Sequence, residues 1–152
     1  MSIGPRTWAK SFLLCVCLAF LPYSAFSAEA SPTGLWHIMD KETGKPEALI
    51  TIEQQAGTLR GTILKTFPEP GEDPAPRCEL CEGELKDKPV AGLTILWDLR
   101  AEDNKYFNGK VLDPETGKIY RCRLTPSANG KEMQLRVYAA VFWEDRKLLR
   151  VD

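Results

Sequence analysis

Three cysteines beyond the N-terminal segment have the type and spacing that could support chemistry. Cys78 and Cys81 form a Cys-x-x-Cys pair, and Cys122 stands apart from them. A redox-active pair needs a thiolate that is stabilised by cations or by a helix N-terminus. Glu79 and Glu82 lie beside this pair instead, and their charge disfavours a thiolate. The sequence therefore argues against a thioredoxin-like redox centre.

Two other roles remain open for these cysteines. Cys78, Cys81 and Cys122 could bind a metal with His37 as the fourth ligand of a tetrahedral Cys₃His set. Alternatively, a disulfide staples the segment that contains the pair, either between Cys78 and Cys81 or from one of them to Cys122. Cys122 lies two residues from Tyr120 in an alternating run, which predicts an inward position. The sequence favours a disulfide but does not choose the partner.

Catalysis has little support. His37 is the single histidine of the chain, so Ser-His or Cys-His catalysis would depend on it alone. The pattern places no nucleophile beside it. The acidic residues fall in turns and in one long loop, where solvated charge is the default. We therefore expect no enzymatic activity, no catalytic residue and no cofactor.

The first 30 residues are typical of a cleaved secretory signal peptide. Arg6 and Lys10 precede an apolar run of eleven residues, 11–21, which is too short for a membrane-spanning helix of about 20 residues. Cleavage after Ser27 and cleavage after Ala30 fit equally well. We expect an exported protein with no membrane span after signal removal. Because the 20 basic and 21 acidic residues nearly balance, the chain has no net positive charge that would favour binding to nucleic acid.

The rest of the chain, 31–152, predicts one all-β domain. Short alternating runs separated by turn residues suggest about eight strands, at 35–39, 48–53, 58–65, 93–99, 105–112, 118–124, 132–143 and 147–151. Closing these strands into a small antiparallel up-and-down barrel removes exposed sheet edges; a β-sandwich is the alternative. Segment 66–89, rich in proline and acidic residues, is predicted to be a long loop. Asp40–Lys45 and Asp113–Lys118 repeat one motif and predict two hairpin turns.

Five aromatic residues fall in different predicted strands. An eight-stranded barrel can hold one small ligand, and aromatic side chains commonly line such a cavity. The candidate ligand-binding residues are Trp36, Trp97, Phe107, Tyr120 and Tyr138.

The order of several motifs resembles a known family. Gly34-Leu-Trp36 resembles the opening of lipocalin-like barrels. The longer series includes Thr43-Gly-Lys-Pro46, Pro70-Gly-Glu-Asp-Pro74, Cys78-x-x-Cys81, Lys86-Asp-Lys-Pro89, Leu112-Asp-Pro114 and Tyr120-Arg-Cys122. It is similar to the exported bacterial family catalogued as domain of unknown function 2147. Near the C-terminus, Val137, Ala140 and Asp145 stand where that family has glycine.

The resemblance implies a lipocalin-like barrel in the periplasm. It also implies that Arg150 packs over the ring of Trp36 and closes the barrel base, a cation–π contact. Our leading hypothesis is a periplasmic protein that binds a small apolar or amphipathic molecule in the barrel interior. The alternatives are a cell-envelope interaction protein with a filled barrel, or a thiol or metal-binding protein that uses Cys78, Cys81 and Cys122.

Overall fold

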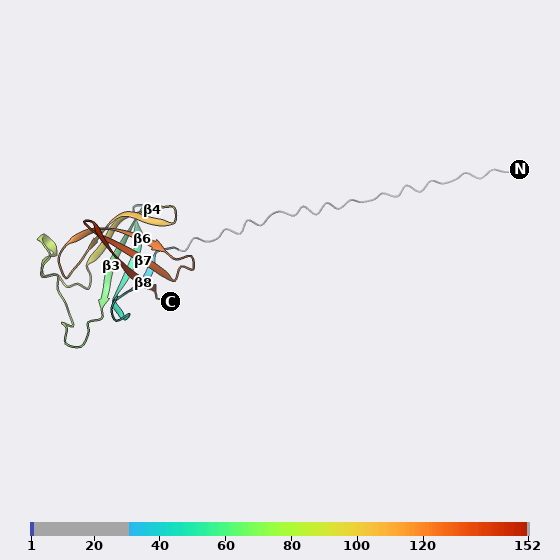
Figure 1. Cartoon of the computed structure of the whole chain (residues 1–152). Helices are drawn as coiled ribbons and strands as arrows, with labels where there is room; N and C mark the ends of the chain where they lie inside the picture. The colour runs from blue at the N-terminus through green and yellow to red at the C-terminus, as the bar shows by residue number, and fades with distance from the viewer. Residues whose placement is uncertain (2–30, 152) are drawn as a thin grey trace.

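The computed structural model describes residue 1 and residues 31–151. The predicted signal peptide, with its two candidate cleavage positions, lies outside these residues. Eight antiparallel strands follow one another in sequence order, and β8 pairs back onto β1 to close a barrel (Figure 1). The strands are β1 Gly34–Met39, β2 Pro46–Gln55, β3 Thr58–Thr66, β4 Thr94–Glu102, β5 Lys105–Leu112, β6 Ile119–Pro126, β7 Glu132–Ala139 and β8 Phe142–Arg150. The predicted barrel is confirmed, and the β-sandwich is wrong.

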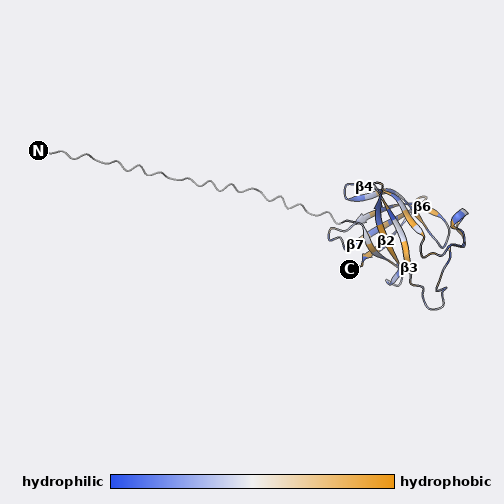
Figure 2. Cartoon of the chain, turned by 180° about the vertical axis from the view of Figure 1, so that it is seen from behind, coloured by the Kyte–Doolittle hydropathy of each residue, from blue (hydrophilic) through white to orange (hydrophobic). Residues whose placement is uncertain are grey.

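The pairing register separates an inner from an outer face, because directly paired residues on neighbouring antiparallel strands point to the same side. One inner row runs through Ala48, Ile38, Leu148 and Met133, all of which are buried. The hydropathy colouring of Figure 2 shows hydrophobic and hydrophilic stretches side by side along the strands. This alternation follows from the two-residue period of the strand. It fills the barrel interior around this row with aliphatic side chains.

Trp36 and Arg150 shut one end of the barrel, called here the closed end. Trp36 is 0% exposed, and the guanidinium carbon of Arg150 lies 4.3 Å from its ring centroid. The two residues are also direct partners in the β1–β8 ladder. Arg150 donates hydrogen bonds to the carbonyls of Gly130, Thr33 and Ser31. The contact implied by the family resemblance is therefore present, and one arginine bridges two separate backbone segments, at 31–33 and at Gly130.

The opposite end, called the open end, carries the loops 40–45, 67–93, 113–118 and the 140–141 turn. The segment 67–93 extends from the barrel on the side away from the C-terminus (Figure 1) and contains the short 3₁₀ helix η1 Gly83–Leu85. A disulfide joins Cys78 to Cys81, which answers the question that the sequence left open. The Cys78 sulfur lies 3.2 Å from the carbonyl oxygen of Pro114, so the disulfide rests on the β5–β6 turn.

The two repeated motifs form equivalent turns. Asp40 accepts hydrogen bonds from the backbone of Glu42 and Thr43, and Asp113 accepts them in the same way from the two residues at the same offsets. Gly44 and Gly117 then take φ values of 68° and 69°. Their surroundings differ: a Cβ on Gly44 meets nothing within 4 Å, whereas one on Gly117 overlaps the carbonyl of Leu80.

This difference yields a matched prediction about how the long segment is held. Gly44→Ala and Gly117→Ala incur the same left-handed backbone penalty, about 1–2 kcal/mol. Only Gly117→Ala also pushes the disulfide loop off the barrel. We expect Gly117→Ala to lower the denaturation midpoint further and to expose segment 67–93 to limited proteolysis, whereas Gly44→Ala leaves that segment protected. Equal protease sensitivity in the two variants would show that the loop does not depend on this contact.

The prediction of one strand over 132–143 is wrong. The chain reverses at Ala140 and Val141, and Ala139 pairs with Phe142 across a two-residue turn. No Gly, Asn or Asp marks this turn, so the sequence carries no turn signal. Ala140 adopts φ 53°, a left-handed conformation that favours glycine. The glycine that the resembling family has at this position thus has a backbone explanation.

Ala140→Gly is expected to stabilise the protein by about 0.5 kcal/mol, because relief of the left-handed strain exceeds the added chain entropy of glycine. Ala139→Gly, one residue earlier within β7, should instead destabilise by about 0.5–1 kcal/mol. Thermal unfolding of the two variants tests this contrast. A lower melting temperature for Ala140→Gly contradicts it.

Candidate binding site at the open end

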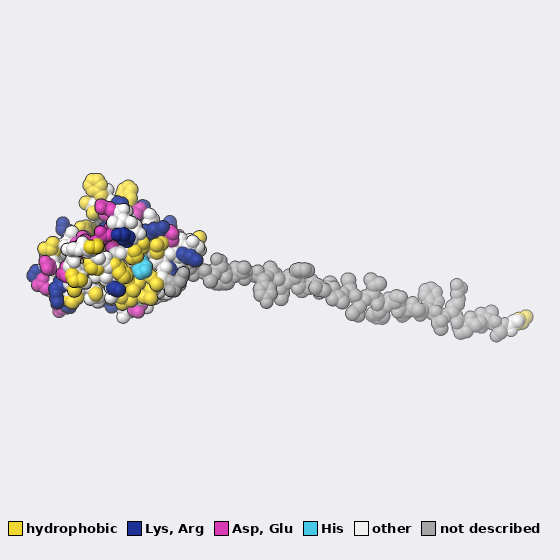
Figure 3. Space-filling view, turned by 90° about the horizontal axis from the view of Figure 1, so that it is seen from below, with side chains coloured by type: hydrophobic (Ala, Val, Ile, Leu, Met, Phe, Trp, Pro, Cys, Tyr) yellow, Lys and Arg dark blue, Asp and Glu magenta, His cyan; other side chains and the backbone are white. Residues whose placement is uncertain are grey.

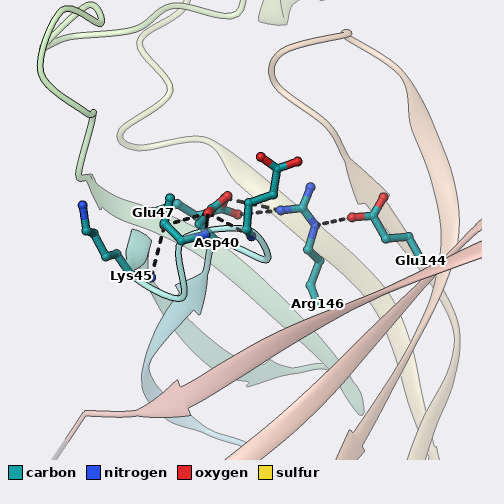
Figure 4. Close-up of polar contacts among 7 residues, drawn as sticks. Asp40, Lys45, Glu47, Glu144 and Arg146 are labelled. Carbon is teal, nitrogen blue, oxygen red and sulfur yellow. Dashed lines mark hydrogen bonds and ion pairs between the residues drawn. The ribbon is translucent and has the colours of Figure 1, made fainter.

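Three charged side chains meet inside the open end of the barrel. Arg146 on β8 contacts both Glu47 on β2 and Glu144 on its own strand, with N···O distances of 3.4 Å and 3.0 Å. Figure 4 shows the Arg146 guanidinium between these carboxylates, with Asp40 and its turn beside Glu47. All three side chains of the triad are partly exposed. This triad of Glu47, Glu144 and Arg146 forms the polar part of the candidate site.

The strand register directs the β8 members of the triad inward. Arg146 pairs with Leu135 and Glu144 pairs with Val137. Leu135 is buried in the core, and Val137 packs against it. Since directly paired residues share a face, Glu144 and Arg146 belong to the inner face of β8, above its buried Leu148.

A β-bulge brings Glu47 to the same place. Ile38 pairs with Ala48 and Met39 pairs with Pro46, so Glu47 is the extra residue on β2. Simple alternation would place Glu47 opposite to the inward Ala48. A bulge interrupts that alternation and redirects a side chain, as is common next to functional sites. The carboxylate of Glu47 consequently reaches Arg146 across the barrel mouth.

The electrostatics of the site are dominated by burial and by an excess of carboxylates. Burial raises the pKa of Glu47, and the nearby charge of Arg146 opposes this shift. Asp40, Glu115 and Glu144 act on Glu47 in the raising direction. The pKa of Asp40 is lowered by hydrogen bonds from Thr43, so this carboxylate stays ionised. Among the charges that act on Glu47, one arginine is therefore set against three carboxylates.

An apolar floor lies below the triad. Tyr120 and Val137 are half-buried and pack against the core. Tyr120 is paired with the buried Val111, and Val137 with the buried Cys122, which places both on the inner face. A molecule entering the open end would meet charged groups at the rim and apolar surface beneath them.

The structure separates the five aromatic residues proposed from the sequence. Trp36 lies at the closed end, and Tyr120 lies on the inner face near the mouth. The other three occupy the outer wall: Trp97 pairs with the exposed Lys110, Tyr138 with the exposed Arg121, and the ring of Phe107 lies 5.8 Å from the guanidinium carbon of Arg123. The five residues therefore do not surround one cavity.

The alternative metal site is not assembled. His37 lies in an outer row, between Leu49 and Leu149, whereas Cys122 is buried on the inner face of β6. Within the described residues no group of three or more His, Cys, Asp or Glu side chains is arranged to hold a metal ion. Burial raises the pKa of Cys122 to about 12, so this free thiol is a poor nucleophile.

The charged triad was not predicted from the sequence. The acidic residues were expected in turns and in the long loop, yet Glu47 and Glu144 lie on strands and are only partly exposed. One signal was available, because Glu144 and Arg146 occupy alternate positions that share a face with Leu148. Two charges continuing an apolar stripe indicate the polar mouth of a barrel. Nothing in the sequence indicated the bulge that redirects Glu47.

Comparisons with known proteins agree with this architecture. A solved structure described as "Protein HP1028 from the human pathogen Helicobacter pylori belongs to the lipocalin family" superposes with a TM-score of 0.68 and 17% identity. The match covers 81% of this chain and 84% of that one. No curated protein matches the chain. Residues 31–151 include no helix that is long and apolar enough to cross a membrane.

A family model matches residues 34–150, which is the entire barrel. The lipocalin-like fold and the family match both agree with what the motif order implied. The chain belongs to the family described as "Uncharacterized protein conserved in bacteria", domain of unknown function 2147.

Proposed function

We propose that this protein is an exported, non-enzymatic binding protein that takes a small amphipathic molecule into the open end of its barrel. The observation that carries the proposal is the half-buried triad of Glu47, Glu144 and Arg146 above an apolar floor. Partly buried charges are costly unless they are paired, and here Arg146 pairs with both carboxylates. Placed at a barrel mouth, they suit the polar head of a ligand whose apolar part lies deeper. The signal-like N-terminus supports a periplasmic location.

The charge of the site favours a cationic head group. Arg146 is already shared between two carboxylates, and Asp40 and Glu115 add further negative potential at Glu47. An ammonium group would compensate this excess, whereas an anionic head would meet repulsion. Tyr120 and Val137 would contact the first part of the ligand's tail. The packed core between the apolar floor and the closed end limits how deep the tail can reach.

A pair of surfactants with the same alkyl tail and opposite heads tests this proposal. Glu47→Gln should weaken binding of the alkyl ammonium probe about tenfold, because it removes one charge from a half-buried site. Glu132→Gln on the outer face of β7 is the control and should bind normally. Calorimetric titration below the micelle concentration measures both. Equal binding by the two variants would contradict the assignment of Glu47.

The affinity for the alkyl ammonium probe should depend on pH through the ionisation of Glu47. Only the ionised carboxylate attracts a cation, so affinity falls as the pH drops through the Glu47 pKa. Because burial raises that pKa, the loss begins above the usual range for glutamate, about 4.3. Glu47→Gln should remove this part of the profile. Preference for the anionic surfactant would overturn the head-group assignment, and binding of neither probe would overturn the proposed function.

A further inference from the structure

The turn between β7 and β8 exposes three consecutive large apolar side chains. Val141, Phe142 and Trp143 are 80%, 74% and 61% exposed. Figure 3 shows apolar side chains that project beyond the compact surface of the molecule. Exposed apolar residues scattered singly are normal, but a contiguous group usually marks an interaction site. We call these three residues the apolar tip.

The outer wall behind the apolar tip is basic and aromatic. One row of paired residues runs across four strands through Lys110, Arg121, Tyr138 and Trp143. Tyr138 and Trp143 thus lie beside Arg121 on the same face. Amphipathic aromatic rings and arginine beside an exposed apolar tip match the composition of a protein surface that lies at a membrane interface.

The neighbouring row adds Arg123 and Arg136. Asp145 forms a bidentate pair with Arg136, at 2.6 Å and 2.7 Å, and Asp98 pairs with Lys110. Arg121 forms no ion pair with any described residue, whereas the Arg123 guanidinium carbon lies 5.8 Å from the Phe107 ring centroid and its Nε atom is buried. The acidic side chains of the wall are therefore engaged, while the charge of Arg121 remains available to an outside partner.

We propose that the apolar tip and Arg121 behind it dock this protein onto an anionic lipid bilayer. Val141, Phe142 and Trp143 enter the acyl boundary, and Arg121 contacts the anionic head groups. A narrow two-residue turn is convex and can insert into a lipid phase. A protein partner would need a broader complementary surface than this turn offers. The charge that remains on the wall is complementary to anionic lipid.

This proposal does not depend on occupancy of the barrel. It does give the open end a defined orientation, because the apolar tip belongs to the same end of the barrel as the triad. Leu80, in the segment 67–93, and Ile119, the first residue of β6, are also exposed apolar residues at the open end. Docking by the tip would bring the mouth close to a source of amphipathic molecules.

Flotation of the whole exported protein with vesicles tests the docking surface. We expect binding to vesicles of phosphatidylcholine mixed with phosphatidylglycerol, and much weaker binding to phosphatidylcholine alone. Phe142→Ser with Trp143→Ser should lower the affinity more than tenfold. Arg121→Gln should lower it about fivefold and reduce its salt dependence. Leu64→Ser and Lys131→Gln, exposed changes elsewhere on the barrel, are the matched controls and should bind normally.

Quenching by brominated acyl chains gives a second readout. Trp143 is exposed, Trp36 is fully buried, and Trp97 is partly buried at the far end of the row, beside Lys110. Quenching on docking should therefore fall most in Trp143→Phe, while flotation persists. All variants share the same N-terminal residues, so differences between them report on the wall and the tip. Equal flotation of the tip and control variants overturns the proposal. A dimer in solution that is lost with Phe142→Ser also overturns it, because the patch would then serve a second copy of the chain.

Discussion

Arg150→Ala is expected to destabilise the protein by about 3 kcal/mol. The substitution removes the guanidinium from the ring of Trp36, 4.3 Å away, a contact worth about 0.5–2 kcal/mol. It also leaves the carbonyls of Gly130 and Thr33 without their donor. A hydrogen bond from a charged donor contributes about 1.5–3 kcal/mol net, and less where water can replace the lost donor. Denaturant unfolding should show a lower midpoint with an unchanged slope.

Two variants sharpen this test. Arg150→Lys keeps the charge but cannot reproduce the fork of donors, so we expect it to lose about 2 kcal/mol. Arg60→Ala, on the exposed face of β3, should stay within about 0.5 kcal/mol of the parent protein. If Arg150→Ala also stayed within that range, Arg150 would not be the closure of the barrel base.

Val137→Trp is expected to abolish binding of the alkyl ammonium probe, with a loss of more than tenfold. Val137 lies on the inner face beside Glu144, so an indole there would cover the apolar floor and crowd the triad. Tyr138→Trp is the matched control, because the next residue along the strand faces outward and should leave binding unchanged. Calorimetric titration measures the affinities, and circular dichroism verifies that both variants fold.

The outcome of this pair distinguishes an internal site from an external one. Loss of binding with Tyr138→Trp but not with Val137→Trp would place the site on the outer wall. Binding that survives both substitutions would contradict a site beside Val137. In either case the open-end site would have to be abandoned.

The turns and strands of this fold could largely be predicted from the sequence. Asp40 and Asp113 form the expected turns, with Gly44 and Gly117 in the left-handed region. Local chemistry determines such turns, because an Asp side chain accepts from the backbone that follows it. The turn at Ala140 was missed for the same reason, since alanine gives no signal for a positive φ.

The sequence could not predict which aromatic side chains lie on the inner face of the barrel and which lie on the outer face, because bulges shift the two-residue period. Alternation puts Phe107 on the same face as Val111. Asn108 adopts φ 57°, and the register shift between Tyr106 and Gly109 turns Tyr106 inward and Phe107 outward. A one-residue slip moves every following side chain to the other face.

The same effect explains Trp97. Alternation would group Trp97 with Leu99, but Asp98 lies between them at φ 63°, and the β3–β4 pairing shifts its register twice. Leu96 and Leu99 are consequently buried, and Trp97 pairs with Lys110 outside. Asp and Asn tolerate such conformations, but their presence in a strand does not reveal where the register breaks.

Mass spectrometry of the protein recovered from a bacterial periplasm tests the central claim most directly, first under native conditions and then after denaturation without reductant. We predict a native mass above that of the polypeptide, with the excess released on denaturation as a small amphipathic molecule. The denatured mass should also show a cleaved signal peptide and two hydrogens missing for the Cys78–Cys81 disulfide. A native mass equal to the bare polypeptide, together with no uptake of either alkyl surfactant, would contradict a ligand-binding barrel.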